Sequence, residues 1–206
     1  MVHAAIALLS FAAFAPSSAS PASLPTPRAV LAAASDTTKW RIDVSHSELT
    51  FRIRHLVSRV NGTFREWSGT MTGDPADWSN GGSVEVTIQT ASIDTRSERR
   101  DQHLRSPDFF DAAAHPTITF RSRAVRTDGQ TITIDGDLTM RGVTKPVTLT
   151  GEVLGVSDTR AGFSAQTKLN RLDFGVSYNR GVEGGGVLLG DEVTIDIAIE
   201  AVRQKA

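Results

Sequence analysis

The sequence predicts an all-β fold, an antiparallel barrel or sandwich of about eight or nine strands with one helical interruption. From Trp40 onward, apolar and polar residues alternate with a period of two, which is typical of half-buried strands. Glycine turns such as Asp128-Gly129 and Arg141-Gly142 separate the alternating segments. Alternation and turns leave open whether the sheet closes into a barrel or forms a sandwich.

The predicted strands differ in regularity. In the first clear strand, Leu49, Phe51 and Ile53 share one face, and polar side chains take the other. Equally regular segments are 84–89, 132–140, 147–153 and 193–200, and less regular ones are 40–44, 60–71, 117–122 and 160–169. The segment 60–71 changes face near Arg65 and Glu66, which predicts a β-bulge there.

One stretch departs from the period of two. Residues 97–114 are rich in helix formers and begin with Ser97, a residue type that favours helix N-termini. Pro107 is expected to divide this stretch into two short helical pieces. The sequence therefore predicts one short helical insertion in an otherwise antiparallel sheet.

Composition and charge exclude several functional classes. The chain has 206 residues, a formal net charge of -1 and no cysteine. A near-neutral chain lacks the basic surface of duplex-binding proteins, so nucleic acid is not an expected partner. Without cysteine, disulfide scaffolds, thiolate metal sites and cysteine nucleophiles are excluded.

The chain divides into a leader and one predicted domain. Residues 4–15 form an apolar run of signal-peptide length, too short to span a bilayer, and Ala-, Pro- and Ser-rich sequence follows. We expect residues 1–34 to be a signal peptide and disordered leader, and residues 35–206 to be a single domain that is periplasmic or secreted. The lack of a positive charge beside Met1 leaves a disordered alanine-rich tail as the alternative.

The histidine that precedes the first clear strand lies among residues of catalytic type. His46 is flanked by Ser45 and Ser47, with Asp43 nearby. Neighbouring residues of a strand point to opposite faces, so we expect no nucleophilic triad here. A hydrogen-bonding turn just before the strand is the favoured interpretation.

No metal site is predicted. The ligands considered are His46, His55, His103 and His115, with the carboxylates of Asp101, Asp108 and Asp111. The histidines lack the spacing that places two ligands on one helical face. Surface and capping roles are therefore favoured for these side chains.

The helical insertion carries the one dense basic cluster of the sequence, formed by Arg96, Arg99, Arg100, His103 and Arg105. Glu98 and Asp101 are interleaved with these cations, which favours a solvated helix face with local ion pairs. The alternative is an anion site, because arginine offers planar, bidentate geometry to phosphate oxygens.

The apolar faces of the strands must turn inward, because no further helix is predicted to cover the sheet. A closed sheet of about eight strands has a diameter at which side chains either fill the interior or enclose one ligand. A packed core and an apolar cavity therefore both remain open.

Several segments, in order along the chain, carry a resemblance to a known family. They are WRIDVSHSELTFRIRHL, VNGTFREWSG, SIDTRSERRDQHLRSPDFFDAAAHPTITF, IDGDLTMRGVTKPVTL and DEVTIDIAIEAV. Together they resemble the YceI family of polyisoprenoid-binding proteins over roughly residues 40–202. The resemblance implies an extended, lipocalin-like antiparallel β-barrel of about eight strands, whose apolar interior holds a long isoprenoid chain, and it implies export.

The resemblance also implies site residues. The apolar lining would consist of Phe51, Ile53, Phe64, Val86, Ile88, Phe120, Ile134, Leu138, Leu149 and Phe163. The candidates for contact with the polar head of the lipid are Arg54, His55, Arg99 and His103. The segment that contains Phe109 and Phe110 would act as a plug or lid.

The resulting hypothesis is an exported lipid-binding protein that sequesters or carries a polyprenyl or quinone-like chain without catalysis. One alternative is an enzyme acting on a hydrophobic substrate, with His46 or His103 as base. Another is a stress-response barrel with a filled core. The expected partners are an isoprenoid lipid or quinone and, transiently, a membrane. Exposed strand edges or Trp67 would support a homodimer.

Overall fold

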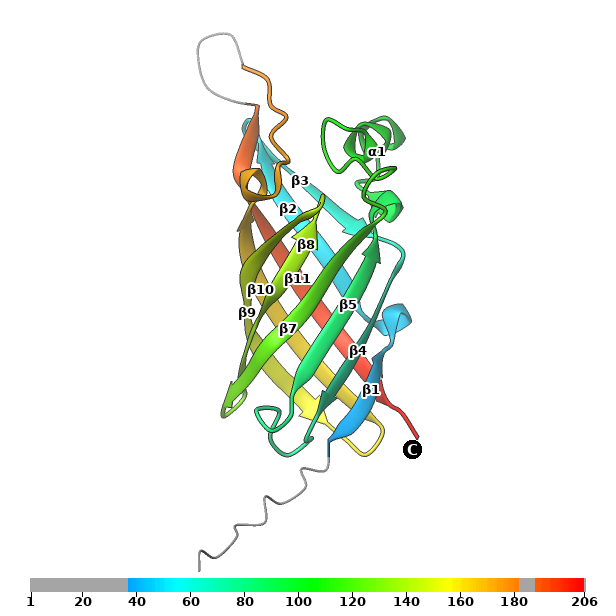
Figure 1. The fold of residues 1–206 in the computed structure, drawn as a ribbon, viewed down its shortest axis with the longest axis vertical. Helices are drawn as coiled ribbons and strands as arrows, with labels where there is room; N and C mark the ends of the chain where they lie inside the picture. Colours follow the sequence, from blue (N-terminus) through cyan, green and yellow to red (C-terminus); the bar gives the residue numbers. More distant parts are fainter. Residues whose placement is uncertain (1–36, 182–187, 206) are drawn as a thin grey trace, which may run out of the picture. The chain divides into compact units, whose positions relative to one another are not determined.

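A computed structural model describes residues 37–181 and 188–205 of the chain. The predicted leader, residues 1–34, lies outside the described residues. In Figure 1 the described strands run obliquely around a common axis, and the α-helix lies at one end of them. The all-β prediction with one helical insertion is therefore confirmed.

The elements follow one another with short connections. In chain order they are β1 (Thr38–Ile42), η1 (Val44–His46), β2 (Glu48–His55), β3 (Ser58–Phe64), β4 (Trp67–Gly73), β5 (Ser83–Gln89), η2 (Thr90–Ser92), β6 (Ile93–Asp94), α1 (Glu98–Arg105), β7 (Thr117–Asp128), β8 (Thr131–Met140), β9 (Val143–Val156), β10 (Arg160–Asn170), η3 (Arg171–Phe174) and β11 (Leu189–Arg203).

Eight strands close into an antiparallel barrel in the order β1, β4, β5, β7, β8, β9, β10 and β11, with β11 pairing again with β1. The wall is extended by strands that continue others after a kink. β2 continues β1 along β11, β3 runs into β4, and β6 follows β5 to pair with β3. Closure decides the fold in favour of a barrel over a sandwich, because a sandwich would leave unpaired edges.

The kinks change the face that side chains present. Between β3 and β4, the strand breaks at Arg65 and Glu66 instead of carrying the predicted bulge. Phe64 and Trp67, three residues apart, consequently both face the barrel interior. The Arg141-Gly142 turn forms as predicted, since both residues have the positive φ, 51° and 72°, that a two-residue hairpin turn of this type needs.

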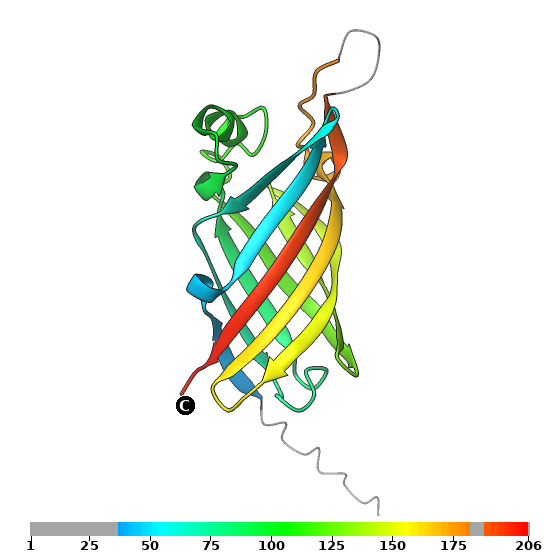
Figure 2. The same cartoon turned by 180° about the vertical axis from the view of Figure 1, so that it is seen from behind.

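The two ends of the barrel are built differently. We call one end the mouth, formed by the β2–β3 turn, residues 95–116, the β8–β9 turn and residues 171–181. The other, the closed end, is formed by residues 74–82 and the β7–β8 and β9–β10 turns. Figures 1 and 2 show α1 and the tip of the β2–β3 hairpin at the same end.

Aromatic packing fills the closed end. Trp40 and Trp78 are both buried, with ring centroids 5.8 Å apart, and Trp78 meets Phe163 edge to face at 4.9 Å. Gly73 leaves room for this arrangement, because an added Cβ there would lie 2.6 Å from Trp78 Cε3. Large aromatic rings in contact supply most of the apolar burial at this end.

The insertion at the mouth contains a single helix. α1 begins after Ser97, whose side chain makes no capping hydrogen bond, and ends at Ser106, before Pro107. The predicted second helical piece is wrong, because residues 107–114 form turns. Proline cannot donate the backbone hydrogen bond that a continued helix requires.

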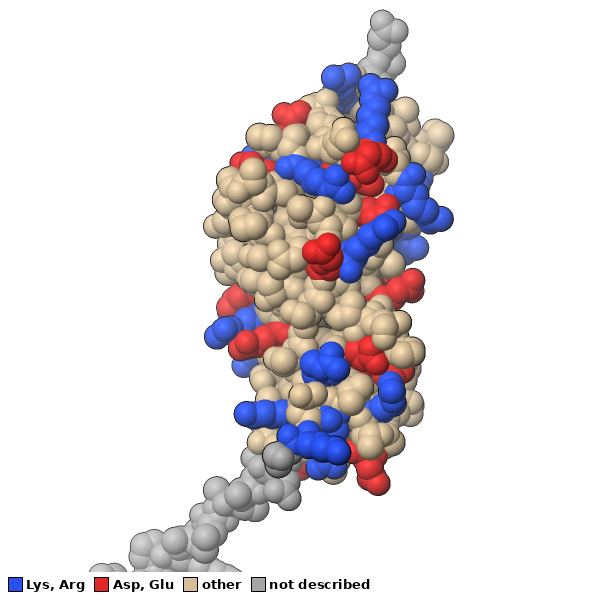
Figure 3. Space-filling model, turned by 90° about the vertical axis from the view of Figure 1, so that its right-hand side faces the viewer, with Lys and Arg blue, Asp and Glu red and all other residues tan. Residues whose placement is uncertain are grey.

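The outer surface carries charges of both signs. Figure 3 shows Lys and Arg interspersed with Asp and Glu over the face that it presents. Cross-strand pairs such as Arg121 with Glu85 and Lys168 with Glu192 belong to this pattern. Among the residues that the structure describes, no helix is long and apolar enough to cross a membrane.

Candidate functional site

The barrel encloses an apolar cavity of about 750 Å³. Its wall follows the inward-facing positions of the strands, and on β11 alone it extends from Leu189 to Ile199. Those ten residue steps, at about 3.3 Å per residue, correspond to roughly 33 Å along the strand. The cavity therefore suits an extended ligand, and its presence contradicts the alternative of a filled core.

All of the residues predicted to line the interior do so. The cavity wall includes Phe51, Ile53, Phe64, Val86, Ile88, Phe120, Ile134, Leu138, Leu149 and Phe163. Phe163 lies where the cavity approaches the closed end, because its ring also packs on Trp78. At the mouth, Leu104, Phe109 and Phe110 of the insertion add to the same apolar wall.

Cations gather where the cavity reaches the mouth. Arg99, Arg100 and His103 of the insertion line it, together with His55 and Arg180. No Asp or Glu of the described residues lines the cavity. The mouth therefore offers positive charge and hydrogen-bond donors to the polar end of a ligand whose apolar part lies in the cavity.

Arg54 is the exception among the predicted polar-head residues. It is exposed on the outer face of β2 and does not line the cavity, whereas its neighbours Ile53 and His55 do. Successive residues of a strand point to opposite faces, so Arg54 and His55 cannot both face the interior. The assignment of Arg54 to the polar head is therefore wrong.

Buried polar contacts fix α1 to the barrel wall. The Asp101 carboxylate, 3% exposed, accepts hydrogen bonds from the backbone amide of Thr95 at 2.9 Å and its hydroxyl at 2.6 Å. Arg100 donates to the Thr95 hydroxyl at 2.6 Å and carbonyl at 2.8 Å, and Arg105 donates to the Ala91 carbonyl at 2.7 Å. Asp101 is an anchor, and it is not part of a solvated helix face.

The basic cluster divides between two roles. Arg105 also pairs with Glu98 at 3.3 Å on the solvent side, as expected for a mixed-charge helix face. Arg99, Arg100 and His103 instead border the cavity, as expected for an anion site. The helix thus turns one edge toward water and the other toward the mouth.

His103 stands in an aromatic cluster at the mouth. Its Nε2 lies 2.8 Å from the Asp108 carboxylate, and its ring meets those of Phe109 and Tyr178 edge to face at 5.0 and 4.9 Å. The Arg180 guanidinium donates to the Tyr178 hydroxyl at 2.9 Å. This cluster joins the insertion to the segment that precedes β11.

Arg171, a buried arginine at the mouth, was not predicted from the sequence. Arg171, 4% exposed, donates to the carbonyls of Gly190 at 2.9 Å, Val176 at 2.6 Å and Tyr178 at 2.9 Å, and to the Asp191 carboxylate at 3.1 Å. It thereby holds the chain that carries Tyr178 and Arg180. Only tertiary contacts distinguish it from a surface arginine, so no local pattern could have found it.

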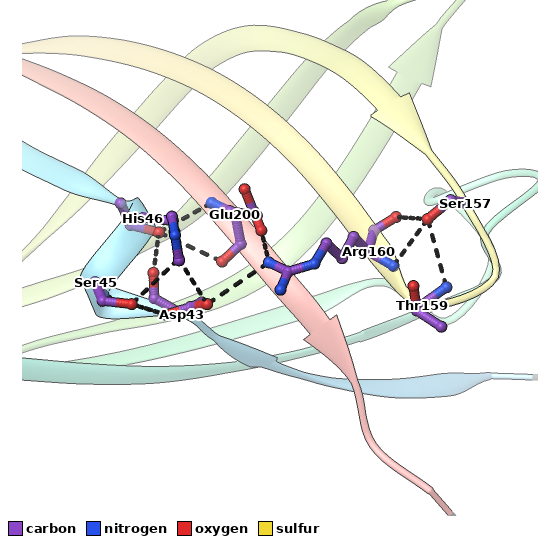
Figure 4. Close-up of polar contacts among 8 residues, drawn as sticks. Asp43, Ser45, His46, Ser157, Thr159, Arg160 and Glu200 are labelled. Carbon is purple, nitrogen blue, oxygen red and sulfur yellow. Dashed lines mark hydrogen bonds and ion pairs between the residues drawn. The ribbon is translucent and has the colours of Figure 1, made fainter.

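A second histidine network lies outside the cavity, on the barrel's outer wall (Figure 4). His46 Nδ1 lies 3.0 Å from the Asp43 carboxylate and 3.2 Å from the Ser45 hydroxyl. These residues form the predicted hydrogen-bonding turn, η1, so the argument that Ser45 and His46 point apart as strand neighbours is wrong. A triad is still excluded, because serine and acid share one ring nitrogen instead of using both.

The same network contains three groups of metal-ligating type. Ligand atoms of Asp43, His46 and Glu200 lie within 4.8 Å of one another. The Arg160 guanidinium contacts the Glu200 carboxylate and lies 3.7 Å from that of Asp43. The guanidinium lies near both carboxylates, so the geometry indicates a surface ion-pair network. Hydrogen bonds from Ser45 and then His46 lower the pKa of Asp43 from 3.8 to about 2.

Trp67 gives no support to the predicted homodimer. Its side chain lines the cavity, because the break at residues 65–66 turns it inward. A tryptophan in that position is not a surface patch that a second chain could cover.

Comparisons with known proteins agree with this architecture. A family model described as the YceI-like domain matches residues 40–201. Protein YceI of Escherichia coli O17:K52:H18 is 42% identical over 166 residues, which cover 78% of this chain and 83% of that protein.

Solved structures give the same result. The crystal structure of the Campylobacter jejuni YceI protein is 32% identical, with a TM-score of 0.65, over 74% of this chain and 91% of that one. A polyisoprenoid-binding domain from Saccharophagus degradans shares the fold at 17% identity, with a TM-score of 0.62, over 80% of this chain and 98% of that domain. The chain belongs to the YceI-like family.

Proposed function

We propose that this protein binds a long isoprenoid lipid, a polyprenyl or quinone-like chain, in the barrel cavity and sequesters or carries it after export. The observation that carries the proposal is the apolar lining that β11 contributes between Leu189 and Ile199, over roughly 33 Å of strand. A compact ligand would leave most of that lining exposed to water. The name of the Saccharophagus degradans domain, which shares the fold, points to the same class of ligand.

The predicted lining residues are proposed to contact the chain of the lipid. Each buried methylene contributes about 0.8 kcal/mol, so a long apolar chain has a strong drive to leave water. It has little drive to leave a bilayer, where its surroundings are equally apolar. Exchange between membrane and barrel therefore runs close to balance, which suits a carrier or a reservoir.

The polar head is proposed to rest at the mouth. Arg99, His103 and His55, predicted from the sequence, line the cavity there, and the structure adds Arg180. Arginine and histidine can donate hydrogen bonds to a phosphate or to a quinone carbonyl. The insertion would act as a plug or lid, and its inner surface is formed by Leu104, Phe109 and Phe110, which belong to the cavity wall.

We infer binding without turnover. His46 lies outside the cavity, which removes one of the two proposed bases. His103 borders the cavity, but its Nε2 contacts the Asp108 carboxylate, and its ring packs against those of Phe109 and Tyr178. These contacts orient and shield the His103 ring, and none of them is with a nucleophile that the ring could activate.

Localisation in the periplasm or outside the cell rests on the leader sequence. Residues 4–15 have the apolar character and length of a signal-peptide core. Processing would leave the domain that begins near residue 35 on the far side of the inner membrane. A lipid with low solubility in water needs a protein carrier in such an aqueous compartment.

Native mass spectrometry of the protein, purified without detergent and followed by solvent extraction, tests the proposal. We expect one stoichiometric adduct whose mass identifies an isoprenoid chain. A folded protein that carries no lipid, and takes up none from vesicles containing polyprenols or quinones, would contradict it.

A pair of neighbouring substitutions on β11 assigns the adduct to the cavity. Ile197 lines the cavity, whereas Ala198 is exposed on the outer wall. Ile197→Trp should fill part of the cavity and reduce occupancy several-fold or select shorter chains. Ala198→Trp adds the same ring outside and should retain the wild-type adduct. Equal lipid retention in both variants would show that the chain lies elsewhere.

A further inference from the structure

We propose that the tip of the β2–β3 hairpin, residues 54–59, docks the mouth of the barrel onto the surface of a bilayer that contains anionic phospholipid. Of this docking hairpin only His55 lines the cavity, and the other five residues lie outside the lining described above. The inference rests on the proposed function in one respect, since a lipid carrier must reach a membrane to exchange its cargo.

The tip of the docking hairpin presents two apolar side chains to water. Val57 is fully exposed, at 105% of its reference area, and Leu56 is 42% exposed. Leu56 also has φ of 52°, a left-handed conformation that glycine or asparagine adopts far more readily. Val57 is not covered by the rest of the fold, and Leu56 is covered only in part. Apolar groups held at a turn in this way gain burial only when something apolar covers them.

Two arginines flank this apolar tip. Arg54 and Arg59 are directly opposite each other in the β2–β3 ladder, and both are exposed. Like charges in such a pair repel each other. Neither arginine has an ion-pair partner among the described residues. The hairpin therefore combines an apolar tip with two arginines that no acidic side chain of the described residues pairs with, which complements the headgroup layer of an anionic bilayer.

The docking hairpin is joined to the entrance of the cavity. The Leu56 amide donates a hydrogen bond to the Leu188 carbonyl at 2.8 Å, and Leu188 lines the cavity. His55, which precedes the tip, lines it as well. Figures 1 and 2 both show this hairpin at the end where α1 lies. Insertion of the tip among lipid headgroups would bring the mouth to the surface from which the cargo leaves.

The other end of the barrel supplies a matched control. Leu154 is 61% exposed near the end of β9, on the far side of the molecule from the mouth. It is apolar and faces water, as Val57 does, but it lies in a strand, whereas Val57 lies in a turn. A general attraction of exposed apolar groups to lipid would involve both residues, whereas docking through the mouth involves Val57 alone.

Co-sedimentation of the purified protein with vesicles tests the proposal. We expect binding to vesicles of phosphatidylglycerol and phosphatidylcholine that weakens with added salt, because salt screens the arginines. Val57→Asp should lower the partition coefficient roughly tenfold, since it removes apolar burial and adds a negative charge. Arg59→Gln should lower it about fivefold on these vesicles and leave binding to pure phosphatidylcholine unchanged. Leu154→Asp should bind as the wild type does.

Leu56→Gly separates docking from folding. Glycine relieves the left-handed conformation, so the variant should be at least as stable as the wild type while it binds vesicles more weakly. Equal binding by wild type and Val57→Asp, or an equal loss in Leu154→Asp, would overturn the proposal, as would wild-type binding that is indifferent to phosphatidylglycerol.

The cargo is measured separately by native mass spectrometry on the same samples. A docking variant that keeps its lipid adduct but loses vesicle binding supports the proposal. Wild type that carries lipid without binding the anionic vesicles contradicts docking and leaves the proposed function intact. Wild type that binds vesicles but never acquires cargo contradicts the proposed function alone.

Discussion

The two ends of the barrel are held together by different kinds of interaction. At the closed end, Trp40, Trp78 and Phe163 pack in direct aromatic contact. At the mouth, the Asp101 carboxylate accepts hydrogen bonds from Thr95 beside an aromatic cluster of His103, Phe109 and Tyr178. The closed end is thus sealed by apolar packing, whereas the mouth combines a smaller aromatic cluster with individual polar contacts.

This difference indicates where stability and access reside. A packed aromatic cluster opens only when a large area of apolar surface is exposed, so it contributes to the global free energy of unfolding. A segment held by a few hydrogen bonds can open locally at much lower cost. The barrel thus concentrates stability at one end and leaves the other able to admit a ligand.

Truncation of the closed-end aromatic cluster should have the largest effect. We expect Trp78→Ala to lower the free energy of unfolding by about 3–5 kcal/mol, because it removes a buried ring and leaves a cavity. Urea denaturation followed by circular dichroism measures this loss.

Trp67→Ala is the matched control for that experiment. Trp67 borders the cavity, so its ring already faces open space on one side. Its loss should therefore cost clearly less than the loss of Trp78. Equal destabilisation by the two substitutions would contradict the division between a sealed end and an open one.

Removal of the main anchor of α1 should have an intermediate and local effect. Asp101→Ala leaves the Thr95 amide and hydroxyl without their acceptor, at a cost of about 1–3 kcal/mol. We expect faster hydrogen exchange in α1 and faster release of bound lipid. Exchange in the strands around Trp78 should stay at the wild-type rate.

Asp101→Asn distinguishes the hydrogen bonds from the shape of the side chain. Its remaining oxygen can replace Asp101 Oδ1, the atom that accepts both bonds from Thr95. Exchange in α1 should therefore be closer to wild type than in Asp101→Ala. Uniformly faster exchange throughout the barrel in either variant would show that α1 is not a separate opening unit.

Alternation along the strands was sufficient to predict the cavity wall. A strand of fixed period two offers one inner position for every outer one, so Val86 and Ile88 could be assigned from the sequence alone. The same rule excludes Arg54 from the interior once His55 is placed there. Barrel closure, in contrast, depends on the pairing of β1 with β11, which no local pattern reveals.

The mouth was predicted less well because its residues depend on tertiary contacts. The sequence pattern presents Asp101 as one charge of a mixed helix face, but its partner, Thr95, lies in the connection between β6 and α1. Arg171 is buried by carbonyls from two other segments. The change of face near Arg65 and Glu66 was predicted, but its consequence, that Trp67 turns inward, was not carried through.

The smallest expected effect concerns η1, where the closed-end strand β1 joins the mouth-end strand β2. Hydrogen bonds from Ser45 and His46 lower the pKa of Asp43 from 3.8 to about 2, so the folded state favours the carboxylate. This stabilisation is fully present above the unfolded value of 3.8 and is lost as the pH falls toward about 2. The junction should therefore weaken in acid.

Asp43→Asn keeps the shape of the side chain and removes its charge. We expect the variant to be slightly less stable than the wild type at neutral pH, with the difference disappearing between pH 3.8 and about 2. Urea denaturation at a series of pH values measures this. A difference that persists below pH 2 would assign the effect to altered hydrogen bonding. Because the junction lies on the outer wall, the lipid occupancy of the cavity should be unchanged in the variant. A loss of stability without a loss of lipid would show that η1 supports the barrel wall and does not control entry at the mouth.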